Sequence, residues 1–188
     1  MSESRPVLFL DRDGILVEVV RRGSVISSAR SWEEFCLVAG AAELVSQWRQ
    51  LGFFTVLVTN QPDVARGFLC PQLLEDFHRE LLRQIPLDAV EVCVEDGCHW
   101  RRKPNPGMLL DAAANWNLDL SRGILLGDRQ SDVLAARAAG VRPVLLSTDY
   151  NLQEVAESGE LTVIQRLDQL TGLLQSTISS VGHNPLGG

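Results

Sequence analysis

The feature of this chain that most constrains its fold is a series of short apolar runs that alternate with segments of helical periodicity. An unbroken apolar run is typical of a strand that is buried on both faces of a sheet. Strands and helices in regular alternation predict an α/β fold, a doubly wound parallel sheet with right-handed crossovers. The predicted strands cover residues 7–10, 53–58, 89–94, 124–126, 144–146 and 161–164, and the predicted helices cover residues 41–50, 71–84, 106–116 and 131–139.

The length of the chain, 188 residues, suits a single domain. We expect residues 1–174 to form that domain. Residues 175–188 are polar and contain glycine and proline, so we expect a flexible C-terminal tail there. Residues 18–34 show no clear period, which predicts a loop or flap above one edge of the sheet.

Charge and cysteine content narrow the class of partner. A formal net charge of −7 and a pI near 4.9 disfavour nucleic acid, because binding to a phosphate backbone needs clustered Lys and Arg. The first apolar run is too short for a signal peptide or a membrane span, so we expect no membrane partner. Four cysteines without any sign of secretion favour reduced thiols or a metal site. We therefore expect a cytoplasmic protein, in which a small anionic substrate would need locally placed cations.

Two carboxylates follow the first predicted strand directly, in the segment Asp11-Arg12-Asp13-Gly14. Because side chains alternate along a strand, we expect Asp11 and Asp13 on the same side at its carboxyl end. A carboxylate pair can bind a cation, or can divide the roles of nucleophile and acid/base when the two pKa values differ. Gly14 lets the chain turn away and leaves room for a ligand. The alternative is an ordinary acidic turn between a strand and a helix.

Three further polar clusters follow predicted strands or precede a helix. Thr59 and Asn60 can both donate hydrogen bonds to phosphate oxygens, although a satisfied turn is the ordinary explanation. Lys103 suits a transferring phosphoryl group and Arg102 offers a planar fork for a second anion, unless the pair is only a solvated basic turn. In residues 127–132, Asp128 follows a glycine at a strand end and a second carboxylate comes four residues later. Hard oxygen ligands of this kind suit Mg²⁺.

The position of the four clusters carries more information than any one of them. Ligands of doubly wound sheets bind at the carboxyl ends of the strands, near the point where the strand order switches. All four clusters fall at such ends or just after them, so one crevice would collect them. Together they supply a nucleophile, a proton donor, a cation site and donors for equatorial oxygens, which is the set of groups that phosphoryl transfer needs.

The same motifs carry a resemblance to a known family. Asp11-Arg12-Asp13-Gly14, Thr59-Asn60-Gln61, Lys103-Pro104 and Gly127-Asp128 through Asp132 occur in this order and span most of the chain. The series resembles the haloacid dehalogenase superfamily. The longer segments Leu10-Asp11-Arg12-Asp13-Gly14, Thr59-Asn60-Gln61 with Ala65-Arg66-Gly67, and Arg102-Lys103-Pro104 with Pro106-Gly107-Met108 are similar to its heptose-bisphosphate and histidinol-phosphate phosphatase branch. The resemblance implies a Rossmann-like domain without a large cap, and an open site.

Roles for the central residues follow from this resemblance. It implies that Asp11 attacks phosphorus to give an aspartyl-phosphate, while Asp13 protonates the leaving oxygen and then activates water. Mg²⁺ would bind the Asp11 carboxylate, the main-chain carbonyl of Asp13, and Asp128. Thr59 and Lys103 would hold the phosphoryl oxygens.

Other residues are expected nearer the substrate. The resemblance places Asn60 and Arg102 there. Arg129 stands where heptose phosphatases of the family often have Lys, so either its main chain lies near the metal or its side chain binds the substrate. Arg21, Arg22 and Arg102 are the candidates for holding a distal phosphate.

One loop departs from the family pattern. Members of this branch usually carry a zinc loop, written Cys-x-His and then Cys-x-Cys directly before Arg-Lys-Pro, and only Cys93 keeps its position here. Glu95, Cys98 and His99 could complete four ligands, but their spacing is cramped and Arg101 adds repulsion. We expect a shortened loop without zinc. Since the loop shapes the pocket in zinc-bearing relatives, its change leaves the substrate open.

The leading hypothesis is a cytoplasmic, Mg²⁺-dependent phosphatase for a small phosphorylated sugar, with a heptose 1,7-bisphosphate cleaved at its 7-phosphate as the implied substrate. Histidinol phosphate is the alternative, and its cationic amine would prefer acidic neighbours such as Glu18 or Glu95. A domain that binds phosphorylated ligands without catalysis is the hypothesis from a different class. The intact pair Asp11 and Asp13 argues against it.

Overall fold

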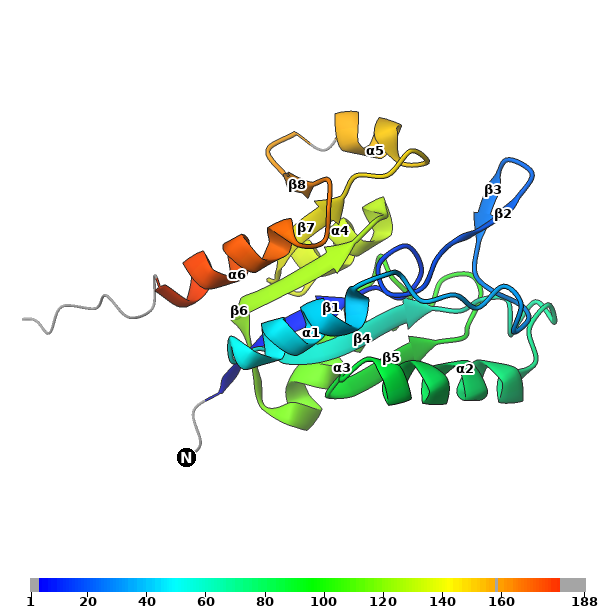
Figure 1. Cartoon of the computed structure of the whole chain (residues 1–188), viewed down its shortest axis with the longest axis horizontal. Helices are drawn as coiled ribbons and strands as arrows, with labels where there is room; N and C mark the ends of the chain where they lie inside the picture. Colours follow the sequence, from blue (N-terminus) through cyan, green and yellow to red (C-terminus); the bar gives the residue numbers. More distant parts are fainter. Residues whose placement is uncertain (1–3, 158, 180–188) are drawn as a thin grey trace, which may run out of the picture.

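A central sheet of six strands organises the molecule, and the computed structural model describes residues 4–157 and 159–179. The strands are β1 (Arg5–Leu10), β4 (Phe54–Asn60), β5 (Ala89–Cys93), β6 (Leu118–Gly127), β7 (Arg142–Leu146) and β8 (Thr162–Ile164). They lie in the order β5-β4-β1-β6-β7-β8, and each neighbouring pair is parallel (Figure 1). The predicted α/β fold with a parallel sheet is confirmed.

Helices cover both faces of this sheet. The helices are α1 (Ala41–Gln50), α2 (Pro71–Gln84), α3 (Gly107–Trp116), α4 (Gln130–Ala138), α5 (Leu152–Ala156) and α6 (Gln169–Ser179). Side chains of β1 alternate between two cores, as the pleat of a strand requires. Leu8 and Leu10 pack into the core that α1, α2 and α6 cover, while Val7 and Phe9 pack into the core that α3 and α4 cover. The sheet is therefore doubly wound.

The order of the strands places one switch point beside β1. The chain passes from β1 to β4 and β5 on one side, and then crosses to β6, β7 and β8 on the other side. The carboxyl ends of β1, β4 and β6 consequently lie next to one another. A doubly wound sheet opens a crevice at such a point, because the connections leave the edge in opposite directions.

Four elements of the described residues were not predicted. A short hairpin, β2 (Val20–Arg22) and β3 (Val25–Ser27), lies within the predicted loop of residues 18–34, and α5 and α6 lie in segments without a predicted helix. Between β1 and α1 the described chain adds this hairpin and irregular loops, and no large cap is present. The helix α6 continues past residue 174 to Ser179, and residues 180–188 of the predicted tail lie outside the described residues. The domain boundary remains a prediction.

Among residues 4–157 and 159–179, no helix is both long and apolar enough to cross a bilayer.

Candidate active site

Asp11 follows the last residue of β1 at the switch point. Its main-chain N–H donates to the carbonyl of Leu126 in β6 at 3.0 Å, so it continues the ladder of the sheet. Its Oδ1 accepts a hydrogen bond from the Arg12 main-chain N–H at 2.7 Å and pairs with Lys103 Nζ at 2.8 Å. Within the described part of the chain, Oδ2 has no such partner. One oxygen is anchored, and the other is available to the pocket that Asp11 lines.

Lys103 reaches Asp11 from the loop before α3, and its side chain is almost fully buried. Its Nζ donates to Val58 O at 2.8 Å and pairs with the carboxylates of Asp11 and Asp132, the latter at 2.6 Å. Of these three partners, Val58 O accepts a hydrogen bond and both carboxylates are ion-pair partners, while the buried Oδ1 of Asp132 accepts no hydrogen bond among the described residues. Asn60 fixes the backbone of Lys103, donating from Nδ2 to its carbonyl at 2.9 Å and accepting its N–H at 3.0 Å.

Three carboxylates gather around this lysine. Oxygen atoms of Asp11, Asp128 and Asp132 lie within 4.8 Å of one another. Burial raises the pKa of Asp11 to about 8 even though Lys103 opposes the shift. Burial and the neighbouring Asp132 raise the pKa of Asp128 to about 6. The site therefore holds more buried negative charge than its nearest cation neutralises.

This excess of charge allows a test of the expected Mg²⁺ site. The Oδ1 atom of Asp128 is buried and accepts no hydrogen bond among the described residues. A hard divalent cation would satisfy that oxygen and neutralise the carboxylate cluster, so the donor set fits Mg²⁺. The cluster includes Asp132, the second carboxylate of residues 127–132, which the sequence already groups with Asp128 as a hard oxygen ligand. Its Oδ2 accepts the main-chain N–H of Arg129 at 3.0 Å, which fixes Asp132 at the start of α4.

Two residues after β7 support Asp128, and neither was predicted. The hydroxyl of Tyr150 donates to Asp128 Oδ2 at 2.6 Å, and Asn151 Nδ2 donates to the Asp128 carbonyl at 2.7 Å. Gly14 makes room for this contact. Its φ of +85° is left-handed, and a Cβ there would lie 2.5 Å from both Tyr150 Oη and Asp128 Oδ2. Position 14 therefore requires glycine for its conformation and for space.

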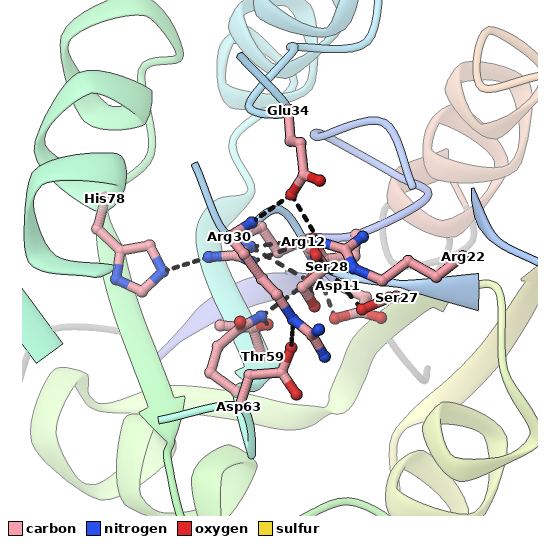
Figure 2. A network of polar contacts seen from close by, with 12 residues as sticks. Asp11, Arg12, Arg22, Ser27, Ser28, Arg30, Glu34, Thr59, Asp63 and His78 are labelled. Atoms are coloured by element: carbon pink, nitrogen blue, oxygen red, sulfur yellow. Dashed lines mark hydrogen bonds and ion pairs between the residues drawn. The ribbon is translucent and has the colours of Figure 1, made fainter. Parts of the chain in front are cut away.

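Asp13, two residues after Asp11, is held by three side chains; Figure 2 shows the surrounding network, with Arg12 and Ser28 labelled. Its carboxylate accepts hydrogen bonds from the Arg12 guanidinium at 3.1–3.3 Å, from Ser28 Oγ at 3.0 Å and from Gln61 Nε2 at 2.8 Å. Gln61 also donates to Thr59 Oγ1 at 2.8 Å. Thr59 is buried at this contact. Its predicted role toward phosphoryl oxygens remains a prediction.

A pocket of about 330 Å³ opens above these groups, within the range of small-molecule sites. Of the predicted site residues, it collects the following: Asp11, Asp13, Asn60, Arg102, Lys103, Asp128 and Arg129. Arg30 and Arg66 also line it; the sequence predicted a role for neither, although Arg66 lies in the motif Ala65-Arg66-Gly67. Arg102 has a buried Nη1 atom without a hydrogen-bond partner among the described residues, and its Nη2 lies 3.9 Å from Asp96. Its guanidinium therefore retains capacity for an anion.

The structure does not bring Arg21 and Arg22 to this pocket. Arg21, in the hairpin, pairs with Asp149 at 2.6 Å, and Arg22 pairs with Glu34 at 2.6 Å. Their charges already have carboxylate partners. The predicted contact of both residues with a distal phosphate stays a prediction.

Arg101 anchors the loop between β5 and α3, which departs from the family pattern. Cys93 Sγ lies 3.9 Å from His99 Nδ1, whereas Glu95 and Cys98 are exposed. Arg101 pairs with Asp111 of α3 and, at 2.7 Å, with Glu91 of β5. Its charge thus links the loop to the two elements on either side of it.

Comparison with known proteins identifies relatives over most of the chain. A family model described as HAD-hydrolase-like matches residues 100–170. A D-glycero-D-manno-heptose-1,7-bisphosphate 7-phosphatase from Chlorobaculum tepidum is 34% identical over 178 residues, an alignment that covers 85% of this chain and 87% of that protein. A D-glycero-beta-D-manno-heptose-1,7-bisphosphate 7-phosphatase from Helicobacter pylori is 35% identical and covers 81% of this chain and 89% of its own.

A solved structure agrees with these sequences. The D,D-heptose 1,7-bisphosphate phosphatase from B. bronchiseptica, complexed with magnesium and phosphate, superposes with a TM-score of 0.77 at 28% identity. The match covers 92% of this chain and 98% of that one. Fold, site and relatives agree on one assignment. The chain belongs to the haloacid dehalogenase superfamily of phosphoric monoester hydrolases, in the family that contains the heptose-bisphosphate phosphatases.

Proposed function

We propose that this enzyme is a cytoplasmic, Mg²⁺-dependent D-glycero-D-manno-heptose 1,7-bisphosphate 7-phosphatase. The observation that carries the chemistry is the cluster of Asp11, Asp128 and Asp132 around Lys103, at the floor of a pocket lined by arginines. The names of the relatives support the substrate. All four cysteines are free, which supports a reducing compartment.

In the first step, Asp11 attacks the phosphorus atom of the 7-phosphate. Oδ2 is the attacking oxygen in this proposal, because Oδ1 is already bound to Arg12 N–H and Lys103. The bond between phosphorus and the sugar oxygen breaks as the Asp11 ester of phosphate forms. Asp13 gives its proton to the departing sugar oxygen, so the product leaves as an alcohol.

In the second step, water attacks the phosphorus atom of the aspartyl-phosphate. Asp13, now ionised, accepts a proton from this water, and the bond between phosphorus and Asp11 breaks. Inorganic phosphate leaves, and Asp11 returns as a carboxylate. The hydrogen bonds from Arg12, Ser28 and Gln61 hold Asp13 in one place for both transfers.

When bound, Mg²⁺ would neutralise charge on the phosphoryl oxygens and keep Asp11 ionised at neutral pH. Asp11 and Asp128 would hold it, with the Asp13 carbonyl as the further ligand that the family pattern implies. Formation of the ester removes the charge of Asp11 and weakens its pairing with Lys103. Lys103 can then donate an N–H to a phosphoryl oxygen. The hydroxyl of Thr59 can donate to another.

The rim of the pocket favours a second phosphate over a cationic amine. Beyond the catalytic carboxylates, four arginines and one acid line it: Arg30, Arg66, Arg102, Arg129 and Asp63. Asp63 already pairs with Arg30 at 2.8 Å. We propose that Arg102 holds the distal phosphate, assisted by Arg129. Histidinol phosphate would place its amine among these cations.

The direct test is phosphate release from both anomers of the heptose bisphosphate and from histidinol phosphate, with Mg²⁺ and with EDTA. We expect selective turnover of the heptose bisphosphate that EDTA abolishes. Asp11→Asn should lower kcat at least about 10³-fold, because it removes the nucleophile. The control is Asp149→Asn, which changes an exposed carboxylate outside the pocket and should keep parent activity.

Preferential turnover of histidinol phosphate would contradict the proposed substrate. A parent enzyme that hydrolyses none of these esters, and an Asp11→Asn variant that binds them equally well, would contradict catalysis itself and favour a binding domain.

A further inference from the structure

Arg12 is among the largest side chains that are completely buried in the described part of the chain. A buried guanidinium is costly unless a counter-charge and hydrogen bonds compensate for lost water. Its carboxylate partner is Asp13, which it contacts through Nε and Nη2. The third nitrogen, Nη1, makes neither of these contacts and instead points toward His78 of α2 (Figure 2).

His78 of α2 meets that nitrogen. The distance from Arg12 Nη1 to His78 Nε2 is 3.2 Å. A guanidinium can only donate, so Nε2 accepts and the imidazole is neutral, with its proton on Nδ1. Burial and the Arg12 charge together lower the pKa of His78 to about 4, although Asp13 opposes this, so the neutral form persists at neutral pH. His78 thus anchors the end of Arg12 that Asp13 does not touch.

We propose that His78 is a positioning residue, which acts through Arg12 to fix the orientation of the Asp13 carboxylate for proton transfer. The proposal rests on the acid/base role of Asp13 in the proposed function. Arg12 is the only cationic donor to Asp13 among the described residues. Its guanidinium is held at Nη1 by His78, and at Nε and Nη2 by the Asp13 carboxylate. Loss of the acceptor leaves Nη1 buried without a partner, and the guanidinium must shift to find another.

This role predicts a dependence on the leaving group. A sugar alkoxide needs a proton while its bond to phosphorus breaks, and Asp13 supplies it. The nitrophenolate ion is stable enough to leave p-nitrophenyl phosphate without a proton. Misplacement of Asp13 should therefore slow transfer of phosphate from a sugar to Asp11, and should leave transfer from the nitrophenyl ester nearly unchanged. General damage to the fold would slow both reactions.

The experiment compares His78→Leu, His78→Gln and the control Arg79→Leu, all on α2. Glutamine places an amide oxygen where Nε2 accepts, leucine offers no acceptor, and Arg79 is an exposed neighbour that pairs with Asp76. Rapid-quench kinetics should show phosphorylation by the heptose bisphosphate slowed about 10–100-fold in His78→Leu, the usual effect of losing a supporting partner, with KM within about twofold. The nitrophenolate burst should stay within about threefold, and His78→Gln should recover most of the loss.

Equal loss on both esters, or a glutamine variant as slow as the leucine variant, overturns the proposal. If His78→Leu does not fold, NMR of the parent decides, because the tautomer of His78 is directly visible. We expect the neutral Nδ1–H form at pH 7, and an Nε2–H or charged ring refutes the contact. If the parent cleaves no heptose bisphosphate, the proposed function fails, while any alkyl phosphate that it does cleave still tests His78 against the nitrophenyl ester.

Discussion

The two oxygens of Asp128 have different surroundings, and the difference comes from one side chain. Oδ2 accepts the hydroxyl of Tyr150, while Oδ1 is buried without a donor. The ring of Tyr150 in turn lies near two cations, with the guanidinium of Arg129 5.0 Å and that of Arg21 5.8 Å from its centroid. These contacts hold the Tyr150 ring in place. Because the hydroxyl of Tyr150 binds Oδ2, Oδ1 is the oxygen of Asp128 that remains available to a cation.

Replacing Tyr150 with Phe should therefore weaken Mg²⁺ binding. The change removes a hydrogen bond to a carboxylate and leaves Asp128 free to rotate, at a cost of about 1–2 kcal/mol, which corresponds to a rise in Kd of about 5–30-fold. Calorimetric titration of Mg²⁺ into the substrate-free protein measures this Kd. The control is Asp149→Asn, an exposed change next to Tyr150 that leaves the Tyr150 hydroxyl in place and should keep the parent Kd. An unchanged Kd in Tyr150→Phe would contradict the positioning role.

The central carboxylates could be predicted from the sequence, because apolar runs mark the strand ends that these residues follow. Asp11 and Asp128 follow β1 and β6 directly, so a parallel sheet necessarily puts them at one edge. Tyr150 and Ser28 could not be found in this way. They reach the site from loops, where the direction of a side chain depends on tertiary contacts and not on a repeating pattern.

At the scale of elements, the loop between β5 and α3 depends on Arg101. This side chain pairs with Glu91 of β5 and with Asp111 of α3. In the same loop, the side chain of Asn105 donates from Nδ2 to the main-chain carbonyl of His99 at 2.9 Å. The next two residues of the loop carry the cations that face the pocket. The ion pairs of Arg101 therefore fix the base from which Lys103 extends.

Replacing Arg101 with Met should destabilise the protein whether or not zinc is present. The side chain is partly exposed, so we expect a loss of about 1–2 kcal/mol, below the cost of breaking a fully buried pair, or about 3–6 °C in Tm. Differential scanning calorimetry with and without added zinc measures it. The matched control is Cys98→Ala, an exposed change in the same loop that should leave Tm unchanged. Loss of Tm on removal of bound zinc from the parent would show that a metal holds the loop instead.

Elements with a clear apolar run or repeat were predictable, and elements without one were not. The bounds of α1 and α2 agree with the predicted helices, because their apolar positions recur over several turns. The strands β2 and β3 have three residues each, too few for an alternation to be recognised. The helix α6 contains Gly172 and threonines, which are weak helix formers. It is stabilised by tertiary contacts instead, including a hydrogen bond from Trp48 Nε1 to Thr171 at 3.0 Å.

Across the whole molecule, the charge balance of the pocket opposes that of the chain. The net charge is −7, yet arginines dominate the rim of the pocket. The acidic exterior repels anions, and the local cations overcome that field only near the site. Below the rim the sign reverses again, because the floor holds three carboxylates against Lys103. Folding without a divalent cation must therefore bury unfavourable charge.

The stability of the metal-free protein should consequently fall as pH rises from 6.5 to 8. The folded-state pKa of Asp11, about 8, exceeds that of an unfolded aspartate, so in this window the folded protein binds more protons than the unfolded chain, and the free energy of unfolding decreases with pH. His78, with its pKa lowered to about 4, acts in the opposite direction mainly below pH 6.5 and only weakly above it, and the raised pKa of Lys103 matters only in stronger alkali. We expect the free energy of unfolding to fall by about 1–2 kcal/mol over this range, or about 3–6 °C in Tm, measured by calorimetry in EDTA.

Asp11→Asn should abolish this pH dependence. Saturating Mg²⁺ should remove it from the parent protein, because a bound cation keeps the Asp11 carboxylate ionised in the folded state. A Tm that rises over this range in EDTA would contradict the buried excess of negative charge.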